Sequence, residues 1–217
     1  MLTDLKRWNA DGVVNLGDSV WGSLDPAGAA QRLMGLPSVR GNQDEIVDLD
    51  HPDLRGLTPE KQRWLNGLPL TLTGGDVLCC HGTPTSNTTY LLETVTPQGA
   101  RSASSAEIRQ RLAGLDVPVI TCGHSHLPRT FQLPGGPLLI NPGSVGMPAY
   151  DHDVPFLHVM EAGSPHARYA VLTQQAAGWK VEHVAVPYDW EGAAQRVAGV
   201  GRPDRAAWLQ SGLVQKV

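Results

Sequence analysis

The sequence predicts a layered α/β protein whose sheets contain both parallel and antiparallel strands. Segments of helical and of strand character alternate through the first half of the 217 residues, and paired strands joined by glycine-rich turns fill the second half. The composition is 41% hydrophobic and 18% charged, which is typical of a globular protein rather than a disordered one. Two sheets packed face to face, with helices outside, would accommodate the expected strands.

The first half of the chain alternates between element types because helical spacing and short apolar runs follow one another. The elements expected there are a helix with the spacing Leu2, Leu5 and Trp8, a buried strand at 13–16, an alanine-rich helix at 26–34, and a helix opened by Thr58-Pro59. Threonine is expected to cap this last helix, and proline suits its first position.

Hairpins dominate the second half, although two further helices are expected at its end. The elements expected there are a hairpin of 70–73 and 77–80, a helix after the capping box of Ser104 and Glu107, a buried strand at 117–122, a hairpin of 130–133 and 138–140, strands at 156–160, 169–174 and 179–186, and helices beginning at Asp189 and Pro203. We therefore expect one domain spanning 1–217, with its core at about 13–186 and C-terminal helices at 189–217.

Charge and apolar content exclude several classes of protein. The chain carries 17 basic and 21 acidic residues, a net charge of −4, which argues against broad binding to nucleic acid or to anionic membranes. No run approaches the roughly 20 apolar residues of a membrane-spanning helix, and residues 1–8 lack a signal-peptide core. We therefore expect a cytoplasmic protein. Cys79, Cys80 and Cys122 stand in apolar runs, which predicts buried thiols rather than a disulfide framework.

Five short segments share one pattern, in which an apolar run stops and a glycine-flanked polar residue follows. They are Leu16-Gly17-Asp18, Arg40-Gly41-Asn42-Gln43-Asp44, Cys80-His81-Gly82, Gly123-His124-Ser125-His126 and Asn141-Pro142-Gly143-Ser144. In α/β folds, the loops beyond the carboxyl ends of strands collect binding residues. Asp18 supplies a carboxylate, Asn42 an amide oxygen, and the three histidines imidazole nitrogens. This mixture of donors suits Mn, Fe, Zn or Ni better than calcium.

Each of these residues taken alone has a plainer interpretation. An Asp or Asn after glycine is usually a turn residue, and a single histidine is usually an ordinary hydrogen-bonded side chain. The pair His124–His126 is more specific, because two imidazoles one residue apart can converge on one ion. A structural zinc site fits less well, since such sites usually hold four Cys or His ligands in closely spaced pairs.

Taken together and in this order, the segments resemble the motifs of the calcineurin-like metallophosphoesterase superfamily. The matching segments are Gly17-Asp18, Gly41-Asn42, His81 and Gly123-His124-Ser125-His126, and the loop 141–146 is similar to one in the small bacterial phosphodiesterase branch. The resemblance covers about 13–168. It implies a four-layer αββα sandwich of two mixed β-sheets with two divalent metal ions at one rim.

The resemblance also implies the ligands and the reaction. Asp18 would bridge the two ions, Asn42, His81 and His124 would complete the shell of one, and His126 would belong to the other. Manganese is the expected metal, with iron, zinc, nickel or magnesium as alternatives. The implied activity is hydrolysis of small phosphodiesters or phosphomonoesters, including nucleotide-derived ones, by a metal-bound hydroxide. The residues expected to take part in catalysis are Asp18, Asn42, Gln43 and His124.

Two features depart from the family pattern. An Asp-x-His motif on a strand of its own should precede Gly17-Asp18, and it is absent, so we expect the first strand of the fold to be missing and the first ion to be weakly held. We also expect an in-frame Asp-x-His segment upstream of Met1 in the coding DNA. The empty sheet position would favour pairing with another chain, as in a homodimer.

The second departure is Gln43, which stands where many relatives carry the histidine that protonates the leaving group. Glutamine cannot act as a general acid near neutral pH. The two departures leave a rival interpretation open, that of a catalytically impaired family member acting as a protein-interaction scaffold, as the retromer scaffold subunit does with this fold. The retained donors at positions 18, 42, 81, 124 and 126 argue against the rival, because a scaffold has no need of them.

Overall fold

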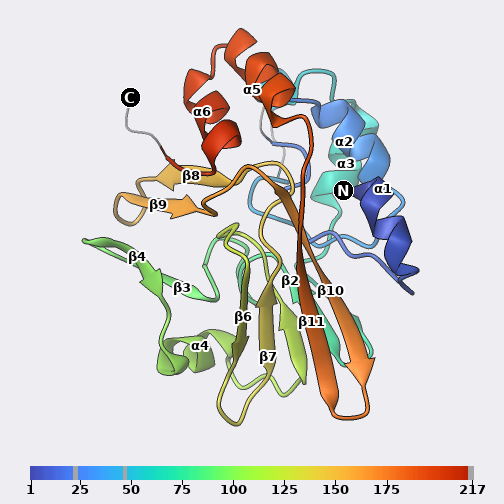
Figure 1. The fold of residues 1–217 in the computed structure, drawn as a ribbon, viewed down its shortest axis with the longest axis vertical. Helices are drawn as coiled ribbons and strands as arrows, with labels where there is room; N and C mark the ends of the chain where they lie inside the picture. The colour runs from blue at the N-terminus through green and yellow to red at the C-terminus, as the bar shows by residue number, and fades with distance from the viewer. Residues whose placement is uncertain (22–23, 46–47, 215–217) are drawn as a thin grey trace.

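The largest sheet among the described residues is a mixed sheet of five strands (Figure 1). The structure is a computed structural model that describes residues 1–21, 24–45 and 48–214. In spatial order its strands are β1 (Thr71–Gly74), β2 (Val77–Cys80), β5 (Val119–Thr121), β7 (Leu138–Asn141) and β6 (Arg129–Gln132). The three inner strands β2, β5 and β7 are parallel, and β1 and β6 add antiparallel at the two edges. Because parallel strands end at the same edge of a sheet, the segments that follow β2, β5 and β7 begin close together.

The remaining strands form three antiparallel pairs. They are β3 (Glu93–Thr96) with β4 (Gly99–Ser102), β8 (Ala149–His152) with β9 (His158–Glu161), and β10 (Ala167–Gln175) with β11 (Gly178–Val186). The helices are α1 (Leu2–Leu5), α2 (Pro26–Leu33), α3 (Pro59–Asn66), α4 (Ser105–Leu112), α5 (Trp190–Gly199) and α6 (Pro203–Ser211), with 3₁₀ turns at Lys6–Trp8 and Pro52–Leu54. Within the described residues, no helix has the length and apolar character needed to cross a bilayer. The predicted α/β class is confirmed, and the five-stranded sheet is the mixed sheet among the described residues.

The helices begin at the capping residues that the sequence indicates. The Thr58 hydroxyl accepts a hydrogen bond from the backbone N–H of Lys61 at the start of α3. At the start of α4, Ser104 and Glu107 form a complete capping box, and Asp189 caps α5. Each cap satisfies backbone N–H groups that lack partners within the helix, which contributes about 1 kcal/mol.

One face of the five-stranded sheet packs against α4. Leu78, Ile120 and Leu139 point to that face and are buried with Ile108 and Leu112 of the helix. Burying each such side chain stabilises the fold by about 1.5–3 kcal/mol. Cys80 and Cys122 lie in the same cluster, Cys79 is buried elsewhere on the sheet, and all three thiols are free, as predicted.

The opposite face of the sheet borders a groove of about 2140 Å³. Val77 and Cys79 line it from the sheet, Tyr169 and Val171 line it from β10, and Leu5 lines it from α1. Figure 1 shows the β10–β11 hairpin running alongside the sheet with α1 near its upper end. This volume exceeds the roughly 300–1,000 Å³ of pockets that hold small ligands.

The predicted strand at 13–16 does not form. Asn15 makes an isolated parallel bridge with Ser38, and the side chain of Val14 is 41% exposed. The N–H of Asn15 donates to the carbonyl of Pro37 at 2.9 Å, and the carbonyl of Asn15 accepts from the N–H of Val39 at 3.0 Å. Its other side faces the groove, where the described residues place no neighbouring strand. A strand needs partners along its length, so the pairing stops at one residue.

Candidate metal centre

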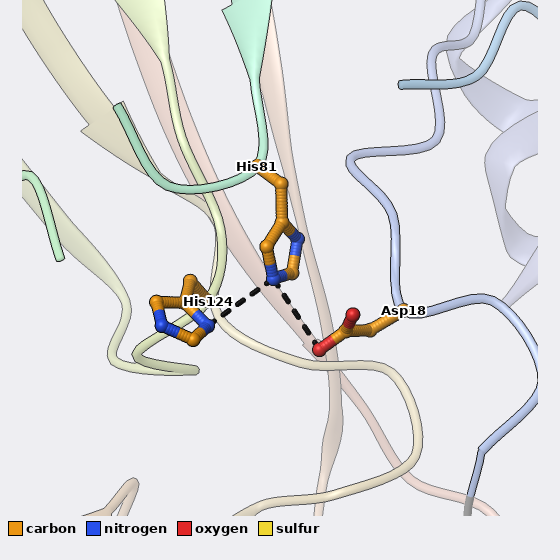
Figure 2. Close-up of side chains that lie close together, drawn as sticks. All are labelled: Asp18, His81 and His124. Atoms are coloured by element: carbon orange, nitrogen blue, oxygen red, sulfur yellow. Dashed lines mark hydrogen bonds and ion pairs between the residues drawn. The ribbon is translucent and has the colours of Figure 1, made fainter. Parts of the chain in front are cut away.

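Four loops bring a side chain each to the carboxyl ends of strands β2 and β5. His81 follows β2 and His124 follows β5, and the N–H of Gly123 donates to the carbonyl of His81 at 2.6 Å, which ties these two loops together. Asp18 and Asn42 follow the two segments joined by the bridge at Asn15. Figure 2 shows Asp18, His81 and His124 pointing toward one another from different parts of the chain.

His81 Nε2 lies at the centre of this group, which we call the donor group (Asp18, Asn42, His81 and His124). It is 3.1 Å from Asn42 Oδ1, 3.2 Å from His124 Nδ1 and 3.3 Å from Asp18 Oδ2. The candidate ligand atoms of Asp18, His81 and His124 all lie within 4.8 Å of one another. Adjacent ligands at about 2.0–2.2 Å from one ion are themselves about 3.0–3.4 Å apart. The spacing and the mixture of oxygen and nitrogen therefore fit a single divalent cation.

Backbone carbonyls orient all three histidines of the predicted site. The contacts are His81 Nδ1 to the carbonyl of Leu16 at 2.7 Å, His124 Nε2 to that of Thr88 at 3.1 Å, and His126 Nδ1 to that of Met147 at 2.8 Å. A carbonyl only accepts, so each of these nitrogens carries a proton, and in the neutral imidazole the other ring nitrogen has a lone pair. Histidines that bind metals are commonly fixed in this way.

The charges of the donor group are strongly coupled. Burial opposes ionisation of Asp18, but the positive field and hydrogen bond of His81 outweigh it and lower the pKa of the carboxyl. Burial likewise opposes charging of His81, and the neighbouring carboxylate of Asp18 outweighs it and raises the pKa of that imidazole. Burial and the charge of His81 lower the pKa of His124 to about 3, so His124 is a neutral donor at physiological pH.

The raised pKa of His81 predicts competition between protons and metal. Below that pKa a proton occupies Nε2, which a cation must displace, so affinity for an added divalent cation should fall as the pH drops, by up to about tenfold per unit. Calorimetric titration in buffers of different ionisation enthalpy should show proton release that grows as the pH falls. An affinity that is flat from about pH 8 to about pH 6 would contradict the assignment of His81 as a ligand.

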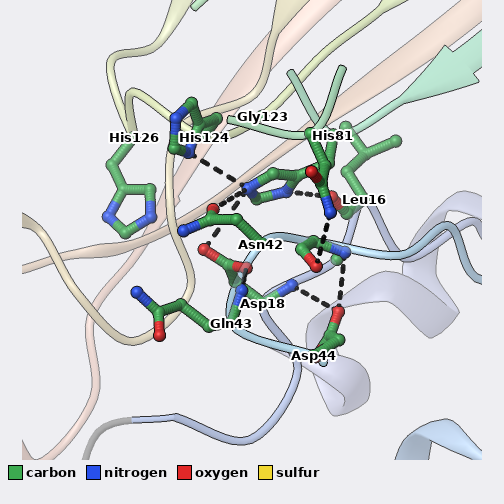
Figure 3. Close-up of polar contacts among 12 residues, drawn as sticks. Leu16, Asp18, Asn42, Gln43, Asp44, His81, Gly123, His124 and His126 are labelled. Atoms are coloured by element: carbon green, nitrogen blue, oxygen red, sulfur yellow. Dashed lines mark hydrogen bonds and ion pairs between the residues drawn. The ribbon is translucent and has the colours of Figure 1, made fainter. Parts of the chain in front are cut away.

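His126 and Gln43 lie beside the donor group. His126 stands to one side of it in Figure 3, close enough for its charge to act on Asp18. Gln43 contacts the group through its backbone, whose N–H donates to Asp18 Oδ1 at 2.9 Å. The structure thus gathers the predicted residues beyond the carboxyl ends of β2 and β5, and their assignment as ligands of particular ions stays a prediction.

Asp44 has a role that the sequence did not reveal. Its carboxylate is fully buried and accepts three backbone N–H groups, those of Asp18, Ser19 and Gly41, each at 2.8 Å (Figure 3). The side chain therefore joins the loop that carries Asp18 to the loop that carries Asn42. An Asp beside a glycine turn is a known acceptor of backbone N–H groups, but its two partner loops could only be identified in the fold.

The backbone of the site is strained. Asp18, His124 and His126 have φ values of 54°, 63° and 61°, in the left-handed region that costs a non-glycine residue of the order of 1–3 kcal/mol. Gly41 packs so closely that a β-carbon there would overlap the carboxylate of Asp18. Such strain persists only where the surroundings hold it, and it is concentrated at functional sites.

Comparisons with known proteins give the family of the chain from a family model and its fold from a solved structure. A family model described as the calcineurin-like phosphoesterase superfamily domain matches residues 1–162. The structure resembles the crystal structure of a metallophosphoesterase from Sphaerobacter thermophilus, with a TM-score of 0.73 and 22% identity over 98% of this chain and 92% of that one. A single mutant of Vps29 from Entamoeba histolytica matches with a TM-score of 0.41 and 20% identity over 86% of this chain and 90% of that one. No match was found among curated protein sequences.

Proposed function

The chain belongs to the calcineurin-like phosphoesterase superfamily, and on that basis we propose that it hydrolyses phosphate esters with the help of a divalent cation held by the donor group. The proposed substrates are small phosphodiesters or phosphomonoesters, including nucleotide-derived ones. The proposed metal is manganese.

One observation supports this proposal above the others, the placement of three possible ligand atoms, from Asp18, Asn42 and His124, around Nε2 of His81. These atoms lie 3.1–3.3 Å from Nε2, so their lone pairs face either the proton of His81 or a cation that displaces it. When bound, a divalent cation in such a site polarises the phosphoryl group and lowers the pKa of a water molecule. The fixed ring orientations of His81 and His124 present the required nitrogens without reorganisation.

The other residues near the donor group can bind and orient the ester. Asn42 directs its Oδ1 at His81, so its amide N–H groups remain to donate to a phosphoryl oxygen. Gln43 can donate a hydrogen bond to the leaving oxygen, but it cannot transfer a proton to it. The groove that begins beside Asp18, Asn42 and Gln43 offers room for the organic part of the substrate.

The identity of Gln43 predicts a preference for good leaving groups. A general acid contributes about 10²–10⁴-fold to the departure of a poor leaving group, so we expect nitrophenyl esters to be cleaved at least about 100-fold faster than matched ethyl esters. Gln43→His should raise turnover of the ethyl esters and leave that of nitrophenyl esters almost unchanged. Equal turnover of both esters by the unmodified protein would show that another group supplies the proton.

The donors present favour one well-held ion and a second that is weakly held. Besides the shared Asp18, the second ion would have only His126 from the predicted ligands, and His126 lies outside the group of mutually close donors found among the described residues. Two ligands hold a divalent cation poorly, since sites of this kind usually supply three or four. We therefore propose that the second ion is only partly occupied.

The rival proposal, a protein-interaction scaffold without activity, predicts no turnover at all. Release of nitrophenol from bis(4-nitrophenyl) phosphate in the presence of Mn²⁺ separates the two. The proposed hydrolase requires Mn²⁺-dependent release that chelator removes and fresh Mn²⁺ restores. No release at any Mn²⁺ concentration, from protein shown to bind the ion, would favour the scaffold.

A further inference from the structure

Two tyrosines that are not metal ligands contact the histidines of the site. Tyr150 lies on β8, and its hydroxyl donates to the backbone carbonyl of His124 at 2.8 Å. The edge of the same ring packs against His126, with ring centres 4.9 Å apart and planes at 67°. A single side chain therefore contacts both histidines of the Gly123-His124-Ser125-His126 loop.

Tyr90 contacts the same loop from another part of the chain. Its ring stacks on the imidazole of His124, with centres 4.3 Å apart and planes 25° from parallel. Its hydroxyl lies 2.9 Å from the hydroxyl of Tyr150 and 3.0 Å from Nε2 of the buried His158. Stacking of two aromatic rings contributes about 0.5–1.5 kcal/mol beyond the area that it buries, and the hydroxyl contacts fix where the ring can lie.

The loop needs such support because its backbone is strained. His124 and His126 both have positive φ values, 63° and 61°, and a loop of this kind relaxes unless neighbouring groups hold it. The carbonyl of His124, which Tyr150 binds, belongs to the peptide that separates His124 from Ser125. Fixing that carbonyl fixes the plane of this peptide and limits the directions that both imidazoles can take.

Neither hydroxyl is suited to be a ligand itself. Burial raises the pKa of Tyr150, and it raises that of Tyr90, so both remain protonated and neutral. The proton of Tyr150 is directed at a backbone carbonyl rather than at the donor group.

The geometry points to Tyr90 and Tyr150 as positioning residues that hold the imidazoles of His124 and His126 in the orientation that binds the metal ion. This inference rests on the proposed metal-dependent function. The two tyrosines would not touch the ion and would act on it only through His124 and His126. Loss of the contacts made by the tyrosine hydroxyls should weaken metal binding while the protein stays folded.

The test compares Tyr90→Phe and Tyr150→Phe with the unmodified protein and with Tyr188→Phe, a matched control that packs against Trp190 away from the site. Changes to groups that orient metal ligands typically cost 10–100-fold in affinity, so Tyr150→Phe should weaken binding of Mn²⁺ and Co²⁺ about 10–100-fold by calorimetry. The visible absorption of bound Co²⁺ should also shift, because it reports the geometry of the ligands. The control should match the unmodified protein in both measurements.

A double-mutant cycle with His124→Ala decides whether the tyrosine acts through the histidine. If it does, adding Tyr150→Phe to His124→Ala should change the affinity by less than about threefold. Equal losses in both backgrounds, or binding by Tyr150→Phe within about twofold of the unmodified protein, would overturn the inference. Failure of the unmodified protein to bind Mn²⁺ would instead overturn the proposed function and this inference with it, so the two failures are distinguishable.

Discussion

Asp18→Asn should remove most of the metal affinity and with it the hydrolysis of bis(4-nitrophenyl) phosphate. The substitution keeps the shape of the side chain and suits the left-handed backbone at this position, where φ is 54°. It removes the only carboxylate of the donor group, together with the negative charge that raises the pKa of His81. Because changes outside the ligand shell already cost 10–100-fold, we expect a loss of more than about 100-fold in affinity for Mn²⁺.

Calorimetry and the nitrophenol assay measure the two effects, and Asp189→Asn is the matched control. Asp189 caps α5 through the N–H of Gly192, and asparagine caps a helix as well as aspartate does. The control should therefore keep full affinity and activity. Activity of Asp18→Asn within about tenfold of the unmodified protein would show that the reaction does not depend on a cation bound by Asp18.

Asp44→Ala should have the largest effect on stability. It leaves three backbone N–H groups without their acceptor, the buried one of Gly41 and the part-buried ones of Asp18 and Ser19. Each unsatisfied buried group costs about 1–3 kcal/mol, so we expect the free energy of unfolding to fall by about 3–5 kcal/mol. That is a large part of the 5–15 kcal/mol that stabilises a typical domain. Urea denaturation of the metal-free protein measures the loss.

The neighbouring Glu45 supplies the control for this prediction. Its side chain is exposed, and its contact with Arg40 has an N···O distance of 3.5 Å, so Glu45→Ala should change the free energy of unfolding by less than about 0.5 kcal/mol. Asp44→Asn should fall between the two, because an amide still accepts but brings donors of its own. A similar small change for both alanine variants would mean that Asp44 does not hold the loops together.

Elements with local signals could be predicted from the sequence, whereas the structure of segments 13–16 and 93–96, which depends on distant partners, could not. The helices that begin after Thr58 and Ser104 are each indicated by a capping residue and a second characteristic residue within the next three positions. The prediction of a strand at 13–16 was wrong because an apolar run does not indicate whether a neighbouring strand is present to pair with it. Strand β3 was missed because its first residue, Glu93, is a buried carboxylate whose partner Arg129 lies far along the chain, with an N···O distance of 3.3 Å.

The residues of the site also fall into those that could be predicted from the sequence and those that could not. Its donors could be predicted because each follows an apolar run beside a glycine, a pattern that the chain repeats in a fixed order. The residues that hold the donors could not, because their contacts cross the fold. Asp44 binds backbone groups about 25 residues away, and Tyr150 binds a carbonyl 26 residues away. Neither contact leaves a local pattern, so only the folded chain identifies these two side chains.

The most direct test of the account is anomalous diffraction from crystals of the protein soaked in Mn²⁺. The account predicts one strong peak at the point where the side chains of Asp18, Asn42, His81 and His124 converge, about 2.0–2.2 Å from each ligand atom. It also predicts a weaker peak or none beside His126. A crystal that shows no manganese at the donor group, or one whose strong peak lies elsewhere in the molecule, would contradict the central claim.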